Sequence, residues 1–129
     1  MGRAGTPISV LVVEDEVLIS NLVADVLSAS GFVVHEVTTA DEALRYIDSD
    51  ADIDVLFADI NLPGSMNGAE LAERARALRP EMPIVYASGR YKLSEVSPLV
   101  PRSLFMAKPY DPNDVCALLT RLTSYGSPN

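Results

Sequence analysis

Five side chains with reactive or ligating groups follow short apolar runs in this sequence. Glu14 and Asp15 come directly after one run, Asp59 ends a second, Ser88 ends a third, and Lys108 follows a fourth. If these runs are parallel strands of one open α/β sheet, the five side chains meet at the carboxyl edge of that sheet, where such sheets bind ligands. Three carboxylates, one hydroxyl and one ammonium group together indicate a site for a charged ligand.

The three carboxylates would repel one another strongly unless a cation lies between them. At an effective dielectric constant of about 20, each pair of unit charges roughly 4 Å apart costs about 4 kcal/mol. Magnesium removes that cost, because this hard cation takes carboxylate, carbonyl, water and phosphate oxygens as ligands. We therefore expect a divalent cation between Glu14, Asp15 and Asp59.

Phosphoryl transfer onto an aspartate is the reaction that best uses this set of groups. An aspartyl carboxylate can act as a covalent nucleophile, and the transfer mainly requires positioning and neutralisation of charge on the phosphoryl oxygens. Asp59 is the expected acceptor because it stands alone at the end of a central strand, whereas Glu14 and Asp15 hold the metal. Lys108 supplies a fixed positive charge, and Ser88 supplies a hydroxyl donor.

Apolar runs alternate along the chain with segments of helical periodicity, and together they predict the elements that position these residues. Strands are expected at 8–13, 32–37, 54–58, 83–88 and 103–107, and helices at 16–30, around 43–47, at 71–78 and at 111–124. Gly31 is expected just beyond the first helix, Thr39 as N-cap of the second, and Asp111 as N-cap of the last with Pro112 at its first position. Such alternation predicts a parallel sheet with right-handed crossovers.

The segment between the fourth and fifth strands is less regular than the rest. It contains Pro98 and Pro101, and proline removes a helical hydrogen bond and clashes with the preceding turn. We expect one or two helical turns within 93–99 and irregular chain after them. The fourth helix of the alternating pattern is therefore expected to be short or irregular.

Length and composition are those of an ordinary globular domain and exclude several classes of protein. The chain has 129 residues, 48% of them hydrophobic, and a formal net charge of −8 with a sequence pI of about 4.4. Such an acidic surface disfavours nucleic acid, because phosphate backbones are bound by clustered Lys and Arg. The apolar runs are far shorter than the roughly 20 residues that span a bilayer. One cysteine, Cys116, excludes an internal disulfide. A cytoplasmic protein with no nucleic-acid or membrane partner is expected.

Four motifs together resemble the receiver domain of two-component response regulators, the family of the bacterial chemotaxis regulator. They are "VLVVEDE" at 10–16, "DVLFADINLPG" at 54–64, "PIVYASG" at 83–89 and "FMAKPY" at 105–110. Each motif is modest by itself, but the four stand in order, each at a predicted strand end. The resemblance covers about residues 8–124.

This resemblance implies a fold and a domain organisation. The fold would be a flavodoxin-like (βα)5 doubly wound parallel sheet with strand order 2-1-3-4-5. Residues 1–129 would form a single receiver domain with its core at about 8–124 and no output domain. The protein would be a monomer or a weak dimer and would act as a regulatory switch. It would catalyse only its own phosphorylation and dephosphorylation, and its downstream protein target is not indicated.

The resemblance also implies roles for the acidic residues. Asp59 would accept a phosphoryl group from a sensor histidine kinase or a histidine phosphotransfer protein. The reaction would require Mg²⁺ (or Mn²⁺). Asp15 would bind the cation directly and Glu14 mostly through water, while Asp59 and the main-chain carbonyl of Asn61 would complete the protein ligands.

Further roles follow for residues at the fourth and fifth strands. Lys108 would pair with the phosphoryl group, and its bond to Pro109 is expected to be cis. Ser88 would swing toward a phosphoryl oxygen and allow Phe105 to turn inward. Arg90, two residues beyond Ser88, flanks the site together with Asn61, and both are candidates to tune hydrolysis of the phosphoaspartate.

Some positions depart from the family pattern or carry no assigned chemistry. The loop from Asp59 to Gly68 is one residue longer than the common spacing, through Ser65 and Met66, and Phe105 replaces a frequent tyrosine. The prolines after Gly89 put the family's usual mode of dimerisation or target binding in question. His35 is expected to be structural. Three loop residues have no predicted role: Met66, Tyr91 and Tyr110.

Two alternative functions stay open from the sequence. The first is an interaction module that keeps the fold and is controlled by binding alone, although the complete set of acids, hydroxyl and lysine argues against it. The second is an aspartate-nucleophile phosphatase of the haloacid dehalogenase type. A phosphatase of that class would need a second acid two residues after the nucleophile, where this chain has Asn61. It would also need a cap or a longer chain.

Overall fold

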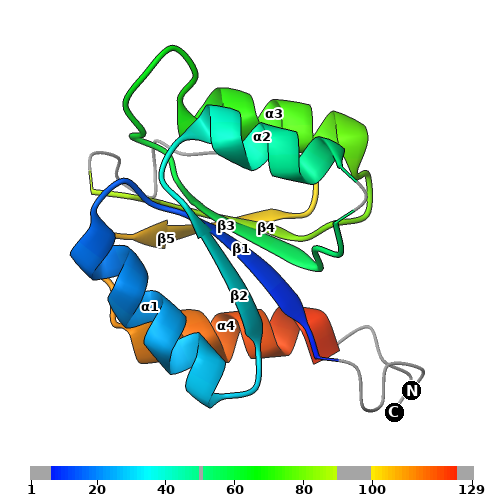
Figure 1. The fold of residues 1–129 in the computed structure, drawn as a ribbon. Coiled ribbons are helices and arrows are strands. Elements are labelled where there is room, and N and C mark those ends of the chain that lie inside the picture. The colour runs from blue at the N-terminus through cyan, green and yellow to red at the C-terminus, as the bar shows by residue number, and fades with distance from the viewer. Residues whose placement is uncertain (1–6, 50, 90–99, 125–129) are drawn as a thin grey trace.

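Five parallel strands form one sheet at the centre of the computed structural model, which describes residues 7–49, 51–89 and 100–124 (Figure 1). The strand order is β2-β1-β3-β4-β5. The strands are β1 (Ser9–Val13), β2 (Val33–Val37), β3 (Val55–Asp59), β4 (Ile84–Ser88) and β5 (Ser103–Ala107). The expected strands and their order are confirmed, with boundaries that differ by one residue at most.

Helices cover both faces of the sheet, as expected of a doubly wound fold (Figure 1). Helices α1 (Val17–Ala29) and α4 (Pro112–Ser124) pack against each other on one face. Helices α2 (Ala40–Asp48) and α3 (Gly68–Leu78) pack against each other on the other face. The short or irregular helix expected within 93–99 lies outside the described residues.

The three central strands β1, β3 and β4 are buried along their whole length, because helices cover them on both sides. Successive side chains of a strand point to opposite faces, so each strand contributes to two apolar clusters. Leu11, Leu56 and Ile84 pack beneath α2 and α3. Val10, Val12, Phe57 and Val85 pack beneath α1 and α4. Continuous burial explains why these strands read as unbroken apolar runs rather than as alternating ones.

The helix boundaries expected from capping residues are confirmed. The Thr39 side chain accepts a hydrogen bond of 3.1 Å from the Glu42 N–H at the start of α2. The Asp111 carboxylate accepts one of 2.8 Å from the Asn113 N–H at the start of α4. Gly31 follows α1 with φ +98°, the left-handed conformation that glycine adopts at little cost.

Helix α3 begins earlier than the spacing of its apolar residues predicted. Asn67 is its N-cap and forms a capping box with Glu70, in which each side chain accepts from the backbone N–H of the other. The preceding Met66 is 8% exposed and belongs to the cluster beneath α2 and α3. Met66 is a loop residue, as predicted, and its side chain packs into the core, for which no prediction was made. Its side chain anchors the lengthened loop to the core.

The helices of the described residues are short and amphipathic. Across 7–49, 51–89 and 100–124, no helix has the length and apolar composition required to cross a bilayer.

Candidate functional site

The predicted site residues meet at the carboxyl edge of the sheet. Asp59 and Ser88 are the last residues of β3 and β4, while Glu14 and Lys108 directly follow β1 and β5. The strands are in register at this edge, with Val13 opposite Ala58, Asp59 opposite Ala87 and Ser88 opposite Ala107. Glu14, Asp59 and Ser88 are only 2%, 6% and 0% exposed. Polar side chains buried this deeply require specific partners.

Both carboxylate oxygens of Asp59 are held by donors from different segments. Oδ1 accepts a hydrogen bond of 3.0 Å from the backbone N–H of Asn61. Oδ2 accepts one of 2.9 Å from the Nζ atom of Lys108. These two bonds fix the orientation of the carboxylate at the end of a central strand.

Lys108 connects two of the acids. Its Nζ atom lies 2.9 Å from Asp59 Oδ2 and 3.3 Å from Glu14 Oε1, and its side chain is 20% exposed. Burial by itself would lower the pKa of Lys108, but the hydrogen bond and charge of Asp59, followed by those of Glu14, raise it above the ordinary value. The group therefore remains a charged ammonium ion at neutral pH.

Glu14 lies among the acids and also accepts a hydrogen bond from the backbone that leads into α1. Its Oε2 atom accepts a hydrogen bond of 3.1 Å from the backbone N–H of Glu16, the residue that precedes α1. Burial raises the pKa of Glu14, and the charge of Asp59 adds to the increase, whereas the bond from Glu16 and the charge of Lys108 oppose it. The net increase shows that the ionised carboxylate is not fully compensated by these partners.

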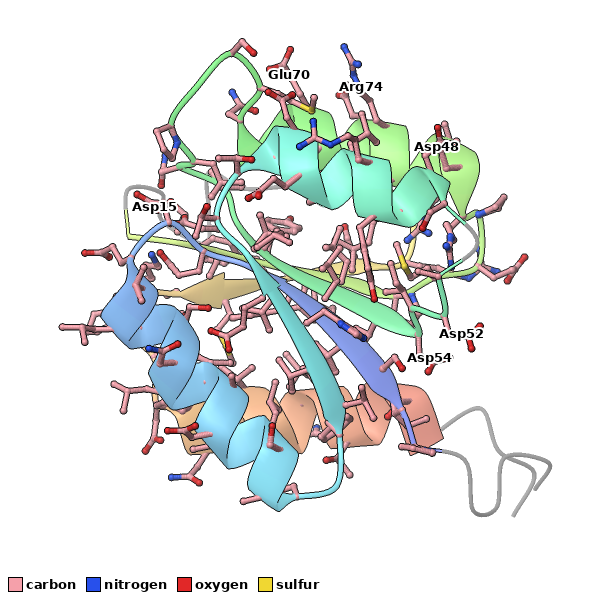
Figure 2. The ribbon with its side chains drawn as sticks, in the orientation of Figure 1. Asp15, Asp48, Asp52, Asp54, Glu70 and Arg74 are labelled. Carbon is pink, nitrogen blue, oxygen red and sulfur yellow. The ribbon has the colours of Figure 1, made fainter. Side chains whose placement is uncertain are left out.

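Three carboxylates are close enough to share one cation. One oxygen each from Glu14, Asp15 and Asp59 lie within 4.8 Å of one another. Asp15 is exposed, and it lies beyond the end of β1 at this edge of the sheet (Figure 2). Hard oxygen ligands of this kind, one of them on an exposed residue, fit a magnesium ion that keeps several waters. The main-chain carbonyl of Asn61 as a further ligand stays a prediction.

The hydroxyl of Ser88 is bonded within the site. Ser88 Oγ donates a hydrogen bond of 2.7 Å to Oδ1 of Asn61. Its strand is tied to the next one, since the Lys108 N–H donates to the Ser88 carbonyl at 3.0 Å. Sequence reasoning considered Asn61 for its carbonyl and as a residue flanking the site, but it did not find this contact of the side chain.

The remaining predicted residues have varied positions. The ring of Phe105 is half-buried and lies 5.7 Å from the ring of Tyr86 at a tilt of 55°, so it already packs against the core. The bond between Lys108 and Pro109 is cis, as expected. Arg90 lies outside the described residues.

Gly68, which sequence reasoning treated only as a loop boundary, lies against the backbone of Asp59. A Cβ atom at Gly68 would come within 2.2 Å of the Asp59 carbonyl oxygen and 2.6 Å of the Ile60 Cα. The Gly68 N–H also donates to the Ile60 carbonyl at 3.0 Å. The start of α3 therefore packs directly against the chain that carries the central acid, and only glycine fits at this position.

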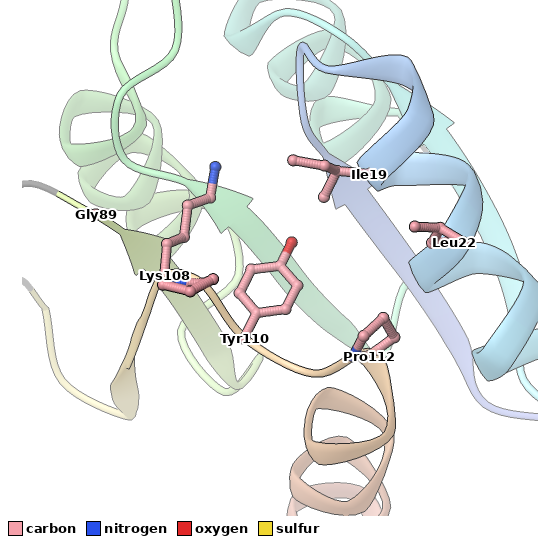
Figure 3. A pocket seen from close by; sticks show the side chains of 7 residues that line it. Ile19, Leu22, Gly89, Lys108, Tyr110 and Pro112 are labelled. Carbon is pink, nitrogen blue, oxygen red and sulfur yellow. The ribbon is translucent and has the colours of Figure 1, made fainter.

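A cavity of about 520 Å³ adjoins the site between α1 and the segment that follows β5 (Figure 3). Ile19 and Leu22 of α1 line one side, and Lys108, Pro109 and Tyr110 line the other. Burial raises the pKa of Tyr110 to about 12, with a further contribution from the negative charge of Glu14. The charges of Glu14 and Asp59 both act on this phenol, so Tyr110, for which no role was predicted, lies near the acids.

Comparison with known proteins identifies what this arrangement is similar to. The family model of the response regulator receiver domain matches residues 10–120. The aerobic respiration control protein ArcA of Escherichia coli K12 is 30% identical over 126 residues, which cover 92% of this chain and 51% of ArcA. The nitrogen assimilation regulatory protein NtrX of Azorhizobium caulinodans is 31% identical over 115 residues, covering 87% of this chain and 25% of NtrX. The chain thus spans about half the length of ArcA and a quarter of that of NtrX.

Solved structures share the whole fold. A response regulator receiver protein from Sinorhizobium medicae has a TM-score of 0.78 at 30% identity, with 93% of this chain and 94% of that one covered. The chemotaxis response regulator CheY4 of Vibrio cholerae has a TM-score of 0.79 at 25% identity, with 91% and 99% covered. Both similarities extend across the sheet, its helices and the edge that carries the acids.

Proposed function

Because this chain belongs to the response regulator receiver domain family, we propose that it is a phosphoacceptor switch of a two-component system and that Asp59 accepts the phosphoryl group. The observation that supports this best is the arrangement around Asp59. Its carboxylate ends a central strand, is oriented by the Asn61 N–H and is paired with the Lys108 ammonium group. A nucleophile held in one orientation beside a fixed positive charge is what phosphoryl transfer requires.

The transfer proceeds by displacement at phosphorus. An oxygen of Asp59 attacks the phosphorus of a phosphohistidine, the new P–O bond forms as the P–N bond breaks, and the imidazole nitrogen keeps the electron pair of that bond. Lys108 neutralises charge on the phosphoryl oxygens. Hydrolysis returns the carboxylate: a water oxygen attacks the same phosphorus, the P–O bond to Asp59 breaks with its electron pair on the carboxylate, and inorganic phosphate is released.

Glu14, Asp15 and Asp59 would hold the Mg²⁺ or Mn²⁺ ion that supports this reaction, together with the Asn61 carbonyl. When bound, the cation offsets the repulsion between the acids and the incoming phosphate. Two properties of the residues support this assignment: the spacing of their oxygens and the raised pKa of Glu14, which a nearby cation would lower.

The signal would leave the site through β4 and β5. Ser88 would exchange its bond to Asn61 for one to a phosphoryl oxygen, and Phe105 would repack behind it. Asn61 and Arg90 would tune hydrolysis of the phosphoaspartate, and Arg90 and Pro109 would flank the site. The phosphodonor would be a sensor histidine kinase or a histidine phosphotransfer protein in the cytoplasm, and the receiver would pass its state to a protein target.

A receiver-like interaction module is the second candidate, and the intact set of Asp59, Lys108 and Ser88 disfavours it. A phosphatase of the haloacid dehalogenase type is less well supported. The residue two positions after Asp59 is the amide Asn61, whose oxygen accepts from Ser88. That amide is no proton donor or acceptor of the carboxylate type.

Incubation with acetyl phosphate and Mg²⁺ tests the proposal. Intact-protein mass spectrometry should show one added phosphoryl group that acid and base conditions remove. Asp59→Asn should abolish the addition, while Asp25→Asn, which removes an exposed acid of α1, should leave it unchanged. An unmodified wild-type chain under these conditions would support the interaction module instead.

A second measurement addresses the cation separately. A ligand that binds only the folded state raises the free energy of unfolding by about 2.7 kcal/mol at a hundredfold excess over its Kd. Mg²⁺ should therefore raise the melting temperature of the wild type, and Asp15→Asn should reduce the increase. Identical melting curves with EDTA and with tens of millimolar Mg²⁺ would contradict the cation site.

A further inference from the structure

Two arginines join the end of α3 to the start of β5, at the edge of the sheet opposite the acids. The guanidinium of Arg76 on α3 donates to the carbonyls of Pro101 and Arg102, at 2.9 and 3.2 Å. It also donates to the carbonyl of Arg79, where α3 ends, at 2.7 Å. The guanidinium of Arg102 donates in the opposite direction, to the Pro80 carbonyl at 3.3 Å. Arg76 and Arg102, called the arginine pair below, therefore connect the two segments from both sides.

The backbone of Arg102 has a conformation that requires such contacts. Its φ angle is +59°, in the left-handed region that is unfavourable for a residue with a Cβ atom. Such a conformation persists only where the surrounding structure fixes it. The Arg102 carbonyl accepts from Arg76 and also from the backbone N–H of Ile84, the first residue of β4, at 3.1 Å. The turn that leads into β5 is thus fixed from α3 and from β4 together.

Strand β5 is held less firmly by burial than the strands at the centre of the sheet. It lies at the edge and pairs with β4. Leu104 and Ala107 are exposed, and Phe105 and Met106 are only half-buried. Elements with few buried apolar contacts open locally at a small cost in free energy. The position of β5 therefore depends strongly on the hydrogen bonds at its two ends.

Different groups hold the two ends of β5. At the carboxyl end, the Lys108 N–H donates to the Ser88 carbonyl at 3.0 Å, and both residues belong to the proposed phosphoryl site. At the amino end, the arginine pair binds carbonyls that take no part in that chemistry. A change at Ser88 and Lys108 consequently acts on one end of the strand while the other end stays bonded to α3.

The bonds of Arg76 account for most of the effect of the arginine pair. Glu81 lies 3.3 Å from the Arg102 guanidinium, but both side chains are more than half exposed, and exposed ion pairs contribute little to stability. Arg76 is better shielded: burial lowers its pKa, the charge of Arg102 lowers it further, and Glu81 opposes the change. Arg76 is therefore the residue whose substitution tests the pair.

We propose that the arginine pair fixes the amino end of β5 in both the unphosphorylated and the phosphorylated state, so that phosphorylation moves this strand at its carboxyl end alone. Arg76 is then a positioning residue for the response of Phe105, whose ring turns relative to a backbone that is held at its start. This inference rests on the proposed function and adds to it a fixed point on the strand that carries the signal.

Two backbone amides report separately on the two ends of β5. The Ile84 N–H donates to the Arg102 carbonyl at the amino end, and the Lys108 N–H donates to the Ser88 carbonyl at the carboxyl end. NMR spectra of ¹⁵N-labelled wild type with Mg²⁺ are compared before and after addition of beryllofluoride, a phosphoryl mimic. The Lys108 signal should shift and the Ile84 signal should keep its position. A shift of the Ile84 signal comparable to that of Lys108 would overturn the proposal.

Hydrogen exchange without beryllofluoride tests whether Arg76 holds the amino end. Arg74→Met is the matched control for Arg76→Met, because Arg74 lies on the same helix, is exposed and points away from the sheet (Figure 2). The Ile84 N–H should exchange about tenfold faster in Arg76→Met than in Arg74→Met, the effect of one lost hydrogen bond to a charged group. Exchange of the Ile60 N–H, which donates to Ala87 at the opposite edge, corrects for any global loss of stability. Equal Ile84 exchange in the two variants would contradict the proposal.

The response to beryllofluoride distinguishes a positioning role of Arg76 from a role in stability alone. In Arg76→Met the Ile84 signal should shift when beryllofluoride binds, because the amino end of β5 then follows the carboxyl end. Arg76→Lys keeps the charge but lacks the planar fork that reaches several carbonyls. It should show the same response to a smaller extent, and it serves as the test if Arg76→Met does not fold. An Ile84 signal that stays in place in both variants would show that the arginine pair only stabilises the fold, which would overturn the inference.

The same measurements separate this inference from the proposed function. Wild type that accepts phosphate from acetyl phosphate, but whose Ile84 signal shifts with that of Lys108, would overturn the inference while the phosphoacceptor function stands. Wild type that neither accepts phosphate nor shows a shift of the Lys108 signal with beryllofluoride would overturn both.

Discussion

Ser88 and Asn61, on neighbouring strand ends, are joined by a hydrogen bond of 2.7 Å from the Ser88 hydroxyl to the Asn61 amide oxygen. The same asparagine donates its backbone N–H to Asp59. Asn61 therefore touches both the residue proposed to accept the phosphoryl group and the residue proposed to respond to it. The bond to Ser88 stabilises the unphosphorylated arrangement and must be exchanged if the hydroxyl is to reach a phosphoryl oxygen.

Asn61→Ala should consequently destabilise the unphosphorylated state more than the phosphorylated one. The free energy of unfolding of the unmodified protein should fall by about 1 kcal/mol, the usual contribution of one such bond. In the presence of Mg²⁺ and beryllofluoride the loss should be smaller, because Ser88 has then left Asn61. Denaturant unfolding in both conditions measures the difference, with Asn21→Ala on the exposed side of α1 as the control. Equal losses in the two conditions would argue against the exchange.

The raised pKa of Glu14 predicts a dependence of stability on pH. A carboxyl whose pKa is higher in the folded protein than in the unfolded chain destabilises the fold as it ionises. This destabilisation is absent below the ordinary value of 4.5 and develops as pH rises through the folded pKa. Glu14→Gln cannot ionise, so its free energy of unfolding relative to wild type should increase from pH 4.5 to pH 8 in EDTA.

At pH 8, Mg²⁺ should have the opposite effect on the difference in stability between Glu14→Gln and wild type. A carboxamide is a weaker ligand than a carboxylate for a hard cation, so Mg²⁺ should stabilise Glu14→Gln less than wild type. Urea unfolding across the pH range, with and without Mg²⁺, provides both comparisons. A difference between the variant and wild type that stays constant with pH would show that Glu14 does not titrate differently in the folded protein.

Much of the fold and the main site residues could be predicted because local patterns determine them. The buried strands read as apolar runs, and the residues that end them lie at one edge by topology alone. That is why Asp59 and Lys108, which lie 49 positions apart in sequence, were expected together and are found 2.9 Å apart. Thr39 and Gly31 were predicted as capping residues for the same reason, since capping depends on near neighbours.

Contacts that depend on side-chain packing could not be predicted. The bond from Ser88 to Asn61 and the unpaired hydroxyl of Tyr110 follow from how separate strand ends and loops meet. The burial of Met66 depends on the path of a loop that is longer than usual. The early start of α3 did leave a signal, because Asn67 followed three residues later by Glu70 is the pattern of a capping box.

Arg79 should be important for the fold and unimportant for the chemistry. Its guanidinium donates to the carbonyls of Ile47, Ser49 and Ala51, at distances from 2.9 to 3.2 Å, and so completes the C-terminal end of α2. Arg79→Met should lower the free energy of unfolding by about 2–3 kcal/mol, since several carbonyls lose a charged donor. Arg74→Met, at an exposed position of α3, should cost less than about 0.5 kcal/mol.

The rate of phosphorylation distinguishes a role of Arg79 in the stability of the fold from a role in the acid site. Below its melting temperature, Arg79→Met should accept phosphate from acetyl phosphate at the wild-type rate, because the arginine binds at the amino edge of the sheet. A rate reduced tenfold or more in folded protein would show that the end of α2 is coupled to the acid site.

Gly68 should link stability to reactivity, in contrast to Arg79. A Cβ atom 2.2 Å from the Asp59 carbonyl cannot be accommodated by a side-chain rotation, because the clash is with backbone. Gly68→Ala must move either the start of α3 or the chain that carries Asp59. We expect a loss of about 2–3 kcal/mol in the free energy of unfolding, as for other overpacked sites.

The rate of phosphorylation of Gly68→Ala should fall as well, because a displaced Asp59 loses its alignment with Lys108 and the transfer is sensitive to shifts of about 1 Å. Gly89→Ala is the control, since its Cβ would lie 3.5 Å from the Lys108 Cβ, an ordinary contact. Stopped-flow phosphorylation by acetyl phosphate, at a temperature where both variants are folded, compares them. Gly68→Ala could instead be destabilised and yet react as fast as Gly89→Ala. That result would show that the start of α3 moves to accommodate the new methyl group and that β3 alone fixes the position of Asp59.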